Sequence, residues 1–309
     1  MTIADFNERH GGDTDNHISV LALYASLILT ITLSALFILK NYVLEPLLPR
    51  LYKHHHARLS DVTKRSFLNQ HVAVGMRLVI LSLGGYPFFA IVFGSSLLST
   101  PVTKHGTVKM GDLLVVSSQL LVGMYIFELI YRVKISVVSA LHHLGTILVA
   151  QCSVAISVYG HKDARNEFIL CCVWGAFDVI VEFLPSLAII RYRTALESHS
   201  HLYYLFKLTM IWTFIGTVLE SVIAMYLFGI LWDQWELSFK LATPILHVAF
   251  SAAQLHGSNI FRKMMLREKK RMRAEGQGVC GGTLEKNESL ENKDGAHGSL
   301  TPSVAGSVV

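Results

Sequence analysis

From Ile18 to Leu39 the chain reads ISVLALYASLILTITLSALFIL, without a single charged side chain. About 20 apolar residues in helical form cross the roughly 30 Å hydrocarbon core of a bilayer. The stretch therefore predicts a membrane-spanning helix over residues 18–40, ending at Lys40. The preceding segment, 1–17, is polar and partly acidic, unlike a signal peptide, so we expect this first helix to remain in the protein.

Six further apolar blocks follow the first one. Only 16% of the 309 residues are charged, against about a quarter in ordinary soluble domains, so the chain lacks the polar surface of a soluble protein. Backbone groups in hydrocarbon must bond within their own segment, so each block should be helical. The sequence predicts an all-α polytopic bundle of about seven helices, with the later spans at 72–98, 111–131, 137–158, 167–190, 204–231 and 241–260.

The basic residues indicate an orientation and a division of the chain. Lys and Arg gather after the first, third and fifth spans and again behind the last one, which by the positive-inside rule predicts a lumenal N-terminus and a cytosolic C-terminus. This placement at span ends argues against nucleic acid as a partner. The expected segments are a polar N-terminus (1–17), a first helix (18–40), an interfacial linker (41–64), a six-helix membrane domain (65–265) and a tail (266–309) that is disordered after Ala274.

Ionisable side chains inside the spans are the main functional signal. Each costs about 2.5–3.5 kcal/mol at a helix centre on insertion scales, so such groups normally face the bundle interior and mark a site. Counting helix rise from the span ends places one group of them in the cytosolic half of the bilayer and places Glu220 toward the other side. That group comprises Arg77, Glu128, His142, His143 and Glu182, and Asp178 is placed near the midplane.

Spacing within the helices favours a cluster. Asp178 and Glu182 are four residues apart and His143 and Thr146 are three apart, so each pair shares a helix face. A carboxylate beside an imidazole orients the ring and raises its basicity, which suits a general base or a nucleophile. The competing interpretation is that these groups pair only to fix helix packing. An opening toward the cytosol would suit a substrate with a charged part and an acyl part, such as acyl-CoA.

Residues 125–146, YIFELIYRVKISVVSALHHLGT, resemble the core of the TLC-domain family. This family includes TRAM-type translocon proteins and the longevity-assurance ceramide synthases. His142-His143 followed by Thr146 is similar to its HHxxT motif, and Asp178 and Glu182 match two acidic positions of a synthase motif. The resemblance covers residues 65–265. It implies catalytic roles for His142, His143, Asp178 and Glu182, with Thr146, Glu128 and Arg77 as substrate-binding candidates.

The resemblance leads to two functional hypotheses. The chain has Trp174 and Gly175 where the synthase motif has His and its first Asp. The first hypothesis is therefore a TLC-like protein that binds, senses or handles lipid in an internal membrane such as the endoplasmic reticulum. The alternative is a ceramide synthase-type N-acyltransferase that moves a fatty acyl group from acyl-CoA to a sphingoid base. The sequence leaves open whether the protein is an enzyme.

Other membrane classes fit the sequence less well. A di-iron hydroxylase needs several HxxxH and HxxHH clusters to converge on two metals, and the clusters His54-His55-His56 and His142-His143 lack that spacing. We expect no metal and no cofactor, with membrane lipid as the partner and acyl-CoA as a conceivable co-substrate. A retinal protein is disfavoured because the last span has no interior Lys, since Lys240 lies at its start.

Overall fold

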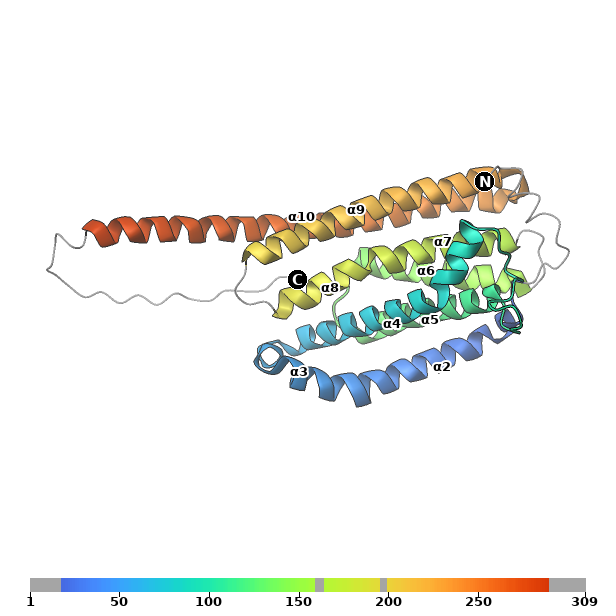
Figure 1. Ribbon diagram of the computed structural model, residues 1–309, viewed down its shortest axis with the longest axis horizontal. Helices are drawn as coiled ribbons and strands as arrows, with labels where there is room; N and C mark the ends of the chain where they lie inside the picture. Colours follow the sequence, from blue (N-terminus) through green and yellow to red (C-terminus); the bar gives the residue numbers. More distant parts are fainter. Residues whose placement is uncertain (1–17, 159–163, 195–198, 289–309) are drawn as a thin grey trace.

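The computed structural model describes residues 18–158, 164–194 and 199–288, with side chains up to Ala274. The described residues are helical almost throughout, and their only strand-like pairing is an isolated bridge between Pro101 and Lys109. Six helical segments are long and apolar enough to cross a membrane. Figure 1 shows the helices lying side by side along the long axis of the molecule. The predicted all-α polytopic bundle is confirmed.

The helical elements follow one another with short connections, apart from the loop between α4 and α5. The first span is a helical segment, Val20–Ala57, that includes a π-helical turn and has a kink at Lys53, where φ is 40°. In chain order the elements are η1 (Val20–Tyr24), α2 (Ala25–Ile38), η2 (Leu39–Leu44), α3 (Glu45–Ala57), α4 (Asp61–Val92), α5 (Met110–Tyr131), α6 (Val137–Val158), α7 (Ala164–Val181), α8 (Phe183–Thr194), α9 (His199–Ile230), η3 (Trp232–Gln234) and α10 (Leu237–Glu288).

Helix α4 begins earlier than its apolar block because a polar cap starts it. The Ser60 hydroxyl accepts a hydrogen bond from the Thr63 N–H, which satisfies one of the free donors of the first turn. The helix ends at Val92, so the predicted span 72–98 was placed too late. Pro87 lies inside α4 and has no N–H to donate to the preceding turn. Figure 1 shows the last turns of α4 directed away from the rest of the helix.

The fifth predicted span is divided into α7 and α8. The two helices meet at Glu182, and together they form one membrane-crossing segment, Ala164–Thr194. Pro185 explains the break, because the N–H that it lacks would have bonded to the carbonyl of Val181 in a regular helix. The break places Glu182 at a joint between the two helices, and its N–H still donates to the Asp178 carbonyl oxygen at 3.0 Å, as in a regular helix.

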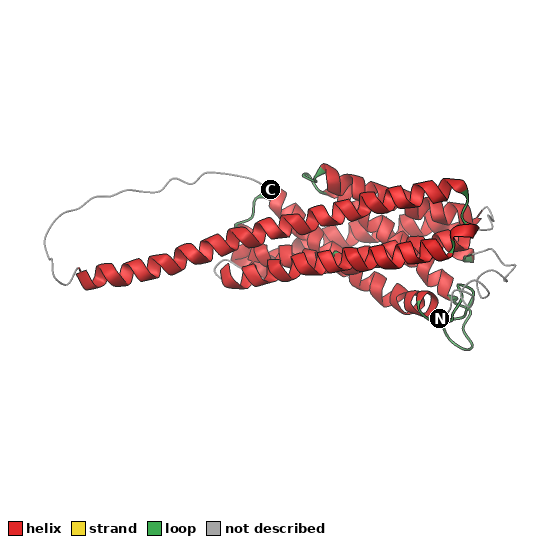
Figure 2. Cartoon of the chain, turned by 90° about the horizontal axis from the view of Figure 1, so that it is seen from above, coloured by secondary structure: helices red, strands yellow, loops and turns green. Residues whose placement is uncertain are grey.

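The seventh predicted span corresponds to the first half of α10. This part is less apolar than the other six segments, since His247, Gln254 and His256 lie within it. It packs along α9, and Figure 2 shows these two long helices next to each other. Helix α10 then projects beyond the other helices (Figure 1) and continues to Glu288, whereas the composition predicts disorder after Ala274. The predicted segment 1–17 and residues 289–309 lie outside the described residues.

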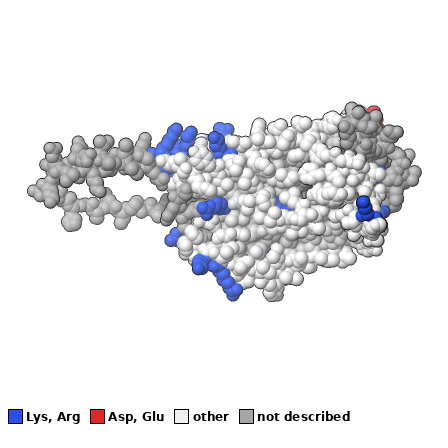
Figure 3. Space-filling model, in the orientation of Figure 1, with Lys and Arg blue, Asp and Glu red and all other residues white. Residues whose placement is uncertain are grey.

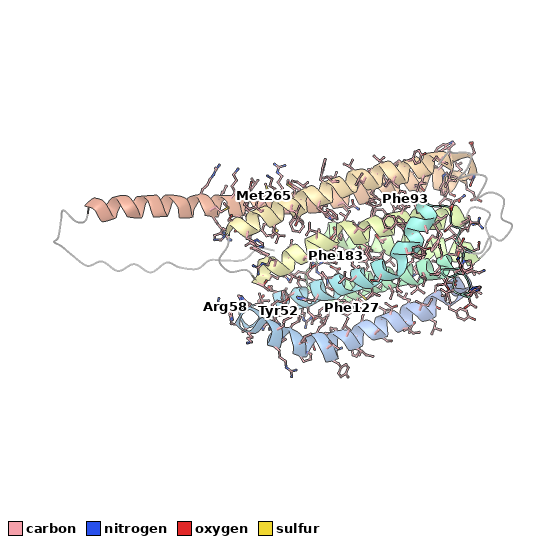
Figure 4. All side chains as sticks on the ribbon, viewed as in Figure 1. Tyr52, Arg58, Phe93, Phe127, Phe183 and Met265 are labelled. Carbon is pink, nitrogen blue, oxygen red and sulfur yellow. The ribbon has the colours of Figure 1, made fainter. Side chains whose placement is uncertain are left out.

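One end of the bundle carries most of the basic side chains on the face that Figure 3 shows. It is the end from which α10 projects, and Figure 4 places Arg58, Tyr52 and Met265 toward it and Phe93 toward the opposite end. We call it the basic end. The structure contains no membrane, so the lumenal N-terminus and the cytosolic C-terminus stay predictions, with the basic end as the predicted cytosolic side.

Candidate functional site

A cavity of about 90 Å³ lies in the middle of the bundle. Its walls come from six helices and are mostly apolar, and the polar lining side chains include His142, Asp178, Glu220, Gln254 and Thr146. The lining residues are Ile80, Leu81, Gly84, Gly85, Phe88, Phe89, Leu114, Ser117, Ser118, Leu121, His142, Thr146, Val149, Ala150, Cys171, Cys172, Trp174, Gly175, Ala176, Asp178, Val179, Ile180, Glu220, Phe250 and Gln254. Neither Lys nor Arg is among them.

His142 and Asp178 form a contact between α6 and α7 at the cavity wall. His142 Nε2 lies 3.2 Å from Asp178 Oδ1, and the Tyr125 hydroxyl donates to Asp178 Oδ2. Asp178 is buried, with 4% of its surface exposed, so each of its oxygens has a partner in a dry environment. The carboxylate therefore orients the His142 ring, while the other ring nitrogen, Nδ1, has no partner within the described residues.

His143 makes a different set of contacts, because adjacent residues on a helix point about 100° apart. Its Nε2 lies 3.7 Å from Glu128 Oε1 on α5 and 3.3 Å from the Ser139 hydroxyl oxygen. Its ring stacks on Tyr125 with the ring centroids 4.2 Å apart. Glu128 also accepts a hydrogen bond from Arg132. His143 is thus paired with Glu128, whereas His142 is paired with Asp178.

Arg77 places a cation beside these carboxylates. It is 3% exposed, its Nη1 donates to the Ser186 hydroxyl oxygen at 2.8 Å, and it interacts electrostatically with Asp178, Glu182 and Glu128. A buried charge persists in an apolar bundle only when opposite charges and hydrogen bonds compensate it. Arg77 therefore joins α4 to α5, α7 and α8 on the side of the cavity that faces the basic end.

Glu220 belongs to the cavity, so the expectation that it lies apart from the other ionisable groups was wrong. It is 3% exposed on α9 and accepts a hydrogen bond from Gln254 Nε2 at 2.6 Å. Gln254 Oε1 in turn accepts from the Thr217 hydroxyl at 2.7 Å. Helix α9 is 32 residues long, about 48 Å at 1.5 Å per residue, and exceeds the bilayer core. Depth counted from the end of its apolar block consequently misplaced Glu220.

Thr146 lies at the cavity wall one turn after His142. Its hydroxyl donates to the His142 carbonyl oxygen at 3.1 Å, so the hydroxyl proton is already engaged in a hydrogen bond to the helix backbone. The hydroxyl oxygen can still accept a bond from a ligand. The aromatic ring of Phe250 packs edge-on against His142 and Trp174, with centroid distances of 5.5 and 5.8 Å. Thr146 and these rings thus complete the wall around His142.

The structure brings the predicted residues together in part. His142, Asp178 and Thr146 line the cavity, while Arg77 and Glu128 lie behind it and Glu182 lies at the joint between α7 and α8. The catalytic and substrate-binding roles of all seven predicted residues stay predictions. Among the described residues, no group of three His, Cys, Asp or Glu side chains is placed to hold a metal ion.

Two residues of the site, Tyr125 and Gln254, did not emerge from the sequence. Tyr125 is fully buried and contacts both Asp178 and His143. Its position three residues before Glu128, on the same helix face, was the available signal. Gln254 is a polar residue within the last apolar block, and a search for ionisable groups alone passes over an amide. Both residues hold a carboxylate in place without being charged.

Comparison with protein-family models, with curated proteins and with solved structures finds no match for this chain. The resemblance to the TLC-domain family therefore rests on the motif residues in α6 and α7 and stays a prediction.

Proposed function

We propose that this multi-pass membrane protein binds and handles a lipid in an internal membrane, with a TLC-like domain formed by residues 65–265. The apolar part of the lipid would occupy the cavity, and its polar part would contact His142 and Asp178. The observation that carries the proposal is one apolar cavity, deep in the bundle, whose wall holds both these side chains. The endoplasmic reticulum is the membrane that the resemblance implies.

The character of the cavity selects the ligand. Small-molecule sites are usually apolar with a few polar groups that fix the ligand's orientation. Here apolar side chains from α4, α5 and α7 supply most of the wall, while His142, Asp178 and Glu220 supply the polar part. An amphiphile with one apolar and one polar part matches this division.

The buried charges support a functional role over a purely structural one. Packing in membranes needs only small residues and occasional polar contacts between helices. Each ionisable side chain in the spans has a cost of about 2.5–3.5 kcal/mol, and Arg77, Asp178 and Glu220 all lie in the middle of the bundle. His142 and Glu220 pair with Asp178 and Gln254 and also line the cavity, a position that helix packing alone does not require.

A second candidate function is acyl transfer from acyl-CoA to an amine. The observation that favours it is the His142–Asp178 pair, in which Nε2 is held by the carboxylate and Nδ1 has no partner within the described residues. As a general base, Nδ1 would take the proton of the attacking amine while the new C–N bond forms and the thioester C–S bond breaks. CoA thiol and the amide would be the products.

The experiment is to measure the lipid that co-purifies with the full-length protein by native mass spectrometry. Val149→Phe fills part of the cavity, and Val138→Phe adds the same ring on the exposed face of the same helix, α6. We expect bound lipid on the wild type and on Val138→Phe and little on Val149→Phe, with equal helicity in all three. Equal amounts of co-purified lipid on Val149→Phe and Val138→Phe would contradict the proposal.

The enzyme candidate has its own test. Membranes that contain the protein are supplied with labelled acyl-CoA of several chain lengths and with a long-chain base. Incorporation above an empty-vector control, lost in His142→Ala, would support acyl transfer. If lipid is found on the purified protein but no labelled acyl group is incorporated, the enzyme candidate is removed and only the binding function remains.

A further inference from the structure

We propose that the ligand enters the cavity sideways from the hydrocarbon core, through a mouth between α4 and α7, and that its polar part is a hydroxyl group. This inference rests on the proposed lipid-binding function and specifies its route and its ligand class. It departs from the expectation of an opening toward the cytosol.

The rim of the cavity consists of two parallel stripes of partly exposed residues. Leu81, Gly85 and Phe89 follow each other at four-residue spacing on α4, and Cys172, Ala176 and Ile180 do so on α7. Residues four apart lie on one helix face, so the two stripes face the same opening. Phe89 is 56% exposed although it lines the cavity, which places the mouth beside it. Gly84, Phe88 and Trp174, on the neighbouring faces, are buried and form the deep wall.

The turn in α4 accounts for the opening. Pro87 lies between the rim residues Gly85 and Phe89, and the last turns of the helix are directed away from its first part (Figure 1). A Cβ atom added at Gly85 would meet no atom within 4 Å, so space remains at this point of the rim. At the preceding residue, by contrast, a Cβ at Gly84 would approach the Ser117 hydroxyl oxygen to 2.8 Å, so α4 and α5 are closed against each other.

The aqueous ends of the bundle are closed. On α5 the cavity lining ends at Leu121, and the buried Tyr125 and Glu128 occupy the next two turns toward the basic end. Arg77 fills the equivalent level on α4 and bonds to Ser186 on α8. The opposite end is covered by a packed cluster of apolar residues that includes Ile18, Ile91, Leu98 and Met110, each at most 2% exposed. Every cavity-lining residue belongs to a helix, and none belongs to a loop.

The polar lining selects the ligand's polar group. Trp174 Nε1 can only donate a hydrogen bond. Within the described residues, the other nitrogen and oxygen atoms of lining side chains that lack a partner are His142 Nδ1 and the hydroxyl oxygens of Ser117 and Ser118. When His142 Nε2–H donates to Asp178, Nδ1 can only accept. A hydroxyl both accepts from Trp174 and donates to His142, whereas an ammonium only donates.

An anionic polar group meets repulsion in this cavity. The wall holds the carboxyl groups of Asp178 and Glu220 and has no Lys or Arg to neutralise a phosphate or a fatty carboxylate. Like charges at short range in a site of low dielectric repel strongly. The preferred ligand is therefore a neutral lipid with a free hydroxyl, such as a long-chain alcohol, a sterol or an acylglycerol.

The route is tested with the full-length protein in nanodiscs, by the rate at which it captures a photoactivatable long-chain alcohol dissolved in the bilayer. Gly85→Phe places a ring at the rim. Gly75→Phe is its matched control, because a Cβ at Gly75 also meets no atom within 4 Å and the residue does not line the cavity. We expect Gly85→Phe to slow capture by about tenfold and Gly75→Phe to leave it unchanged.

The outcomes separate the route from the function. Equal capture rates in Gly85→Phe and Gly75→Phe, with binding intact in the wild type, would overturn the sideways route while the lipid-binding function stands. Absence of capture by the wild type for every lipid tested would remove the function itself. Crosslinks in the wild type at the rim residues would support the route; these residues are Leu81, Gly85, Phe89, Cys172, Ala176 and Ile180.

The polar group is tested with three ligands of equal chain length: a long-chain alcohol, a long-chain amine and a fatty acid. We expect the alcohol to bind most tightly. Trp174→Phe keeps the aromatic packing and removes the N–H. It should therefore weaken the binding of the alcohol by about fivefold and leave the binding of the amine unchanged. Tighter binding of the amine or of the acid to the wild type would overturn the hydroxyl assignment.

Discussion

Replacement of Asp178 by Ala should destabilise the bundle more than any other single truncation at the cavity wall. The Asp178 carboxylate holds two donors from different helices, the Tyr125 hydroxyl on α5 and His142 Nε2 on α6. Hydrogen bonds between membrane helices contribute about 0.6 kcal/mol on average and up to about 1.7 kcal/mol each. Loss of both bonds, together with the unpaired groups left behind, gives an expected loss of about 3 kcal/mol.

Two companion variants divide this total. Asp178→Asn keeps the size of the side chain and one oxygen acceptor, so we expect a loss of about 1 kcal/mol. Tyr125→Phe removes one donor and should also cost about 1 kcal/mol. In the double variant with Asp178→Ala, the Tyr125 change should cost about 1 kcal/mol less than alone, because its acceptor is already absent.

The assay is reversible unfolding of the purified protein in mixed detergent micelles, followed by loss of helical signal as the fraction of SDS rises. The free energies of unfolding of the four proteins in the cycle give the coupling energy directly. Full additivity of Tyr125→Phe and Asp178→Ala would refute the contact between α5 and α7. An unchanged midpoint for Asp178→Ala would refute its role in joining the helices.

Two further predictions concern the packing of α9. A Cβ added at Gly216 would lie 2.3 Å from Val181 Cγ2, whereas one at Gly229 would meet no atom within 4 Å. Gly216→Ala should therefore destabilise by about 1–3 kcal/mol in the same unfolding assay, and Gly229→Ala should not; equal effects would contradict the close crossing of α7 and α9. Gln254→Leu removes the hydrogen-bond donor to Glu220, so we expect it to lower the free energy of unfolding by about 1–3 kcal/mol. Adding Glu220→Gln to this variant should recover part of that loss. No recovery would indicate that the effect of Leu is purely steric.

The fold was largely predictable because it depends on block length and hydropathy. The uncharged run that begins at Ile18 predicts the first span, whereas the division of the fifth predicted span into α7 and α8 was not predicted. Span boundaries were less predictable. Helix α4 begins at Asp61, 11 residues before the predicted span 72–98, because Ser60 caps it, and hydropathy carries no information about such a cap. Helix α10 likewise continues past its apolar part as a helix.

The site was predictable only at the level of residue type. His142 and Asp178 are unusual in apolar blocks, and that signal identified two residues that meet in space. The pairing of His143 with Glu128, and the approach of Glu220 from α9, depend on how helices are rotated and offset against each other. Residue spacing within one helix does not contain this information. The mouth between α4 and α7 depends on the same relative placement.

The most direct test of lipid binding is an experimental density map of the full-length protein in a lipid nanodisc that contains a long-chain alcohol. The account predicts elongated density in the central cavity, with one end within hydrogen-bonding distance of His142 and the other passing between Gly85 and Ala176 toward the bilayer. A well-ordered map in which side chains fill this space, and lipid density is confined to the outer surface of the bundle, would contradict it.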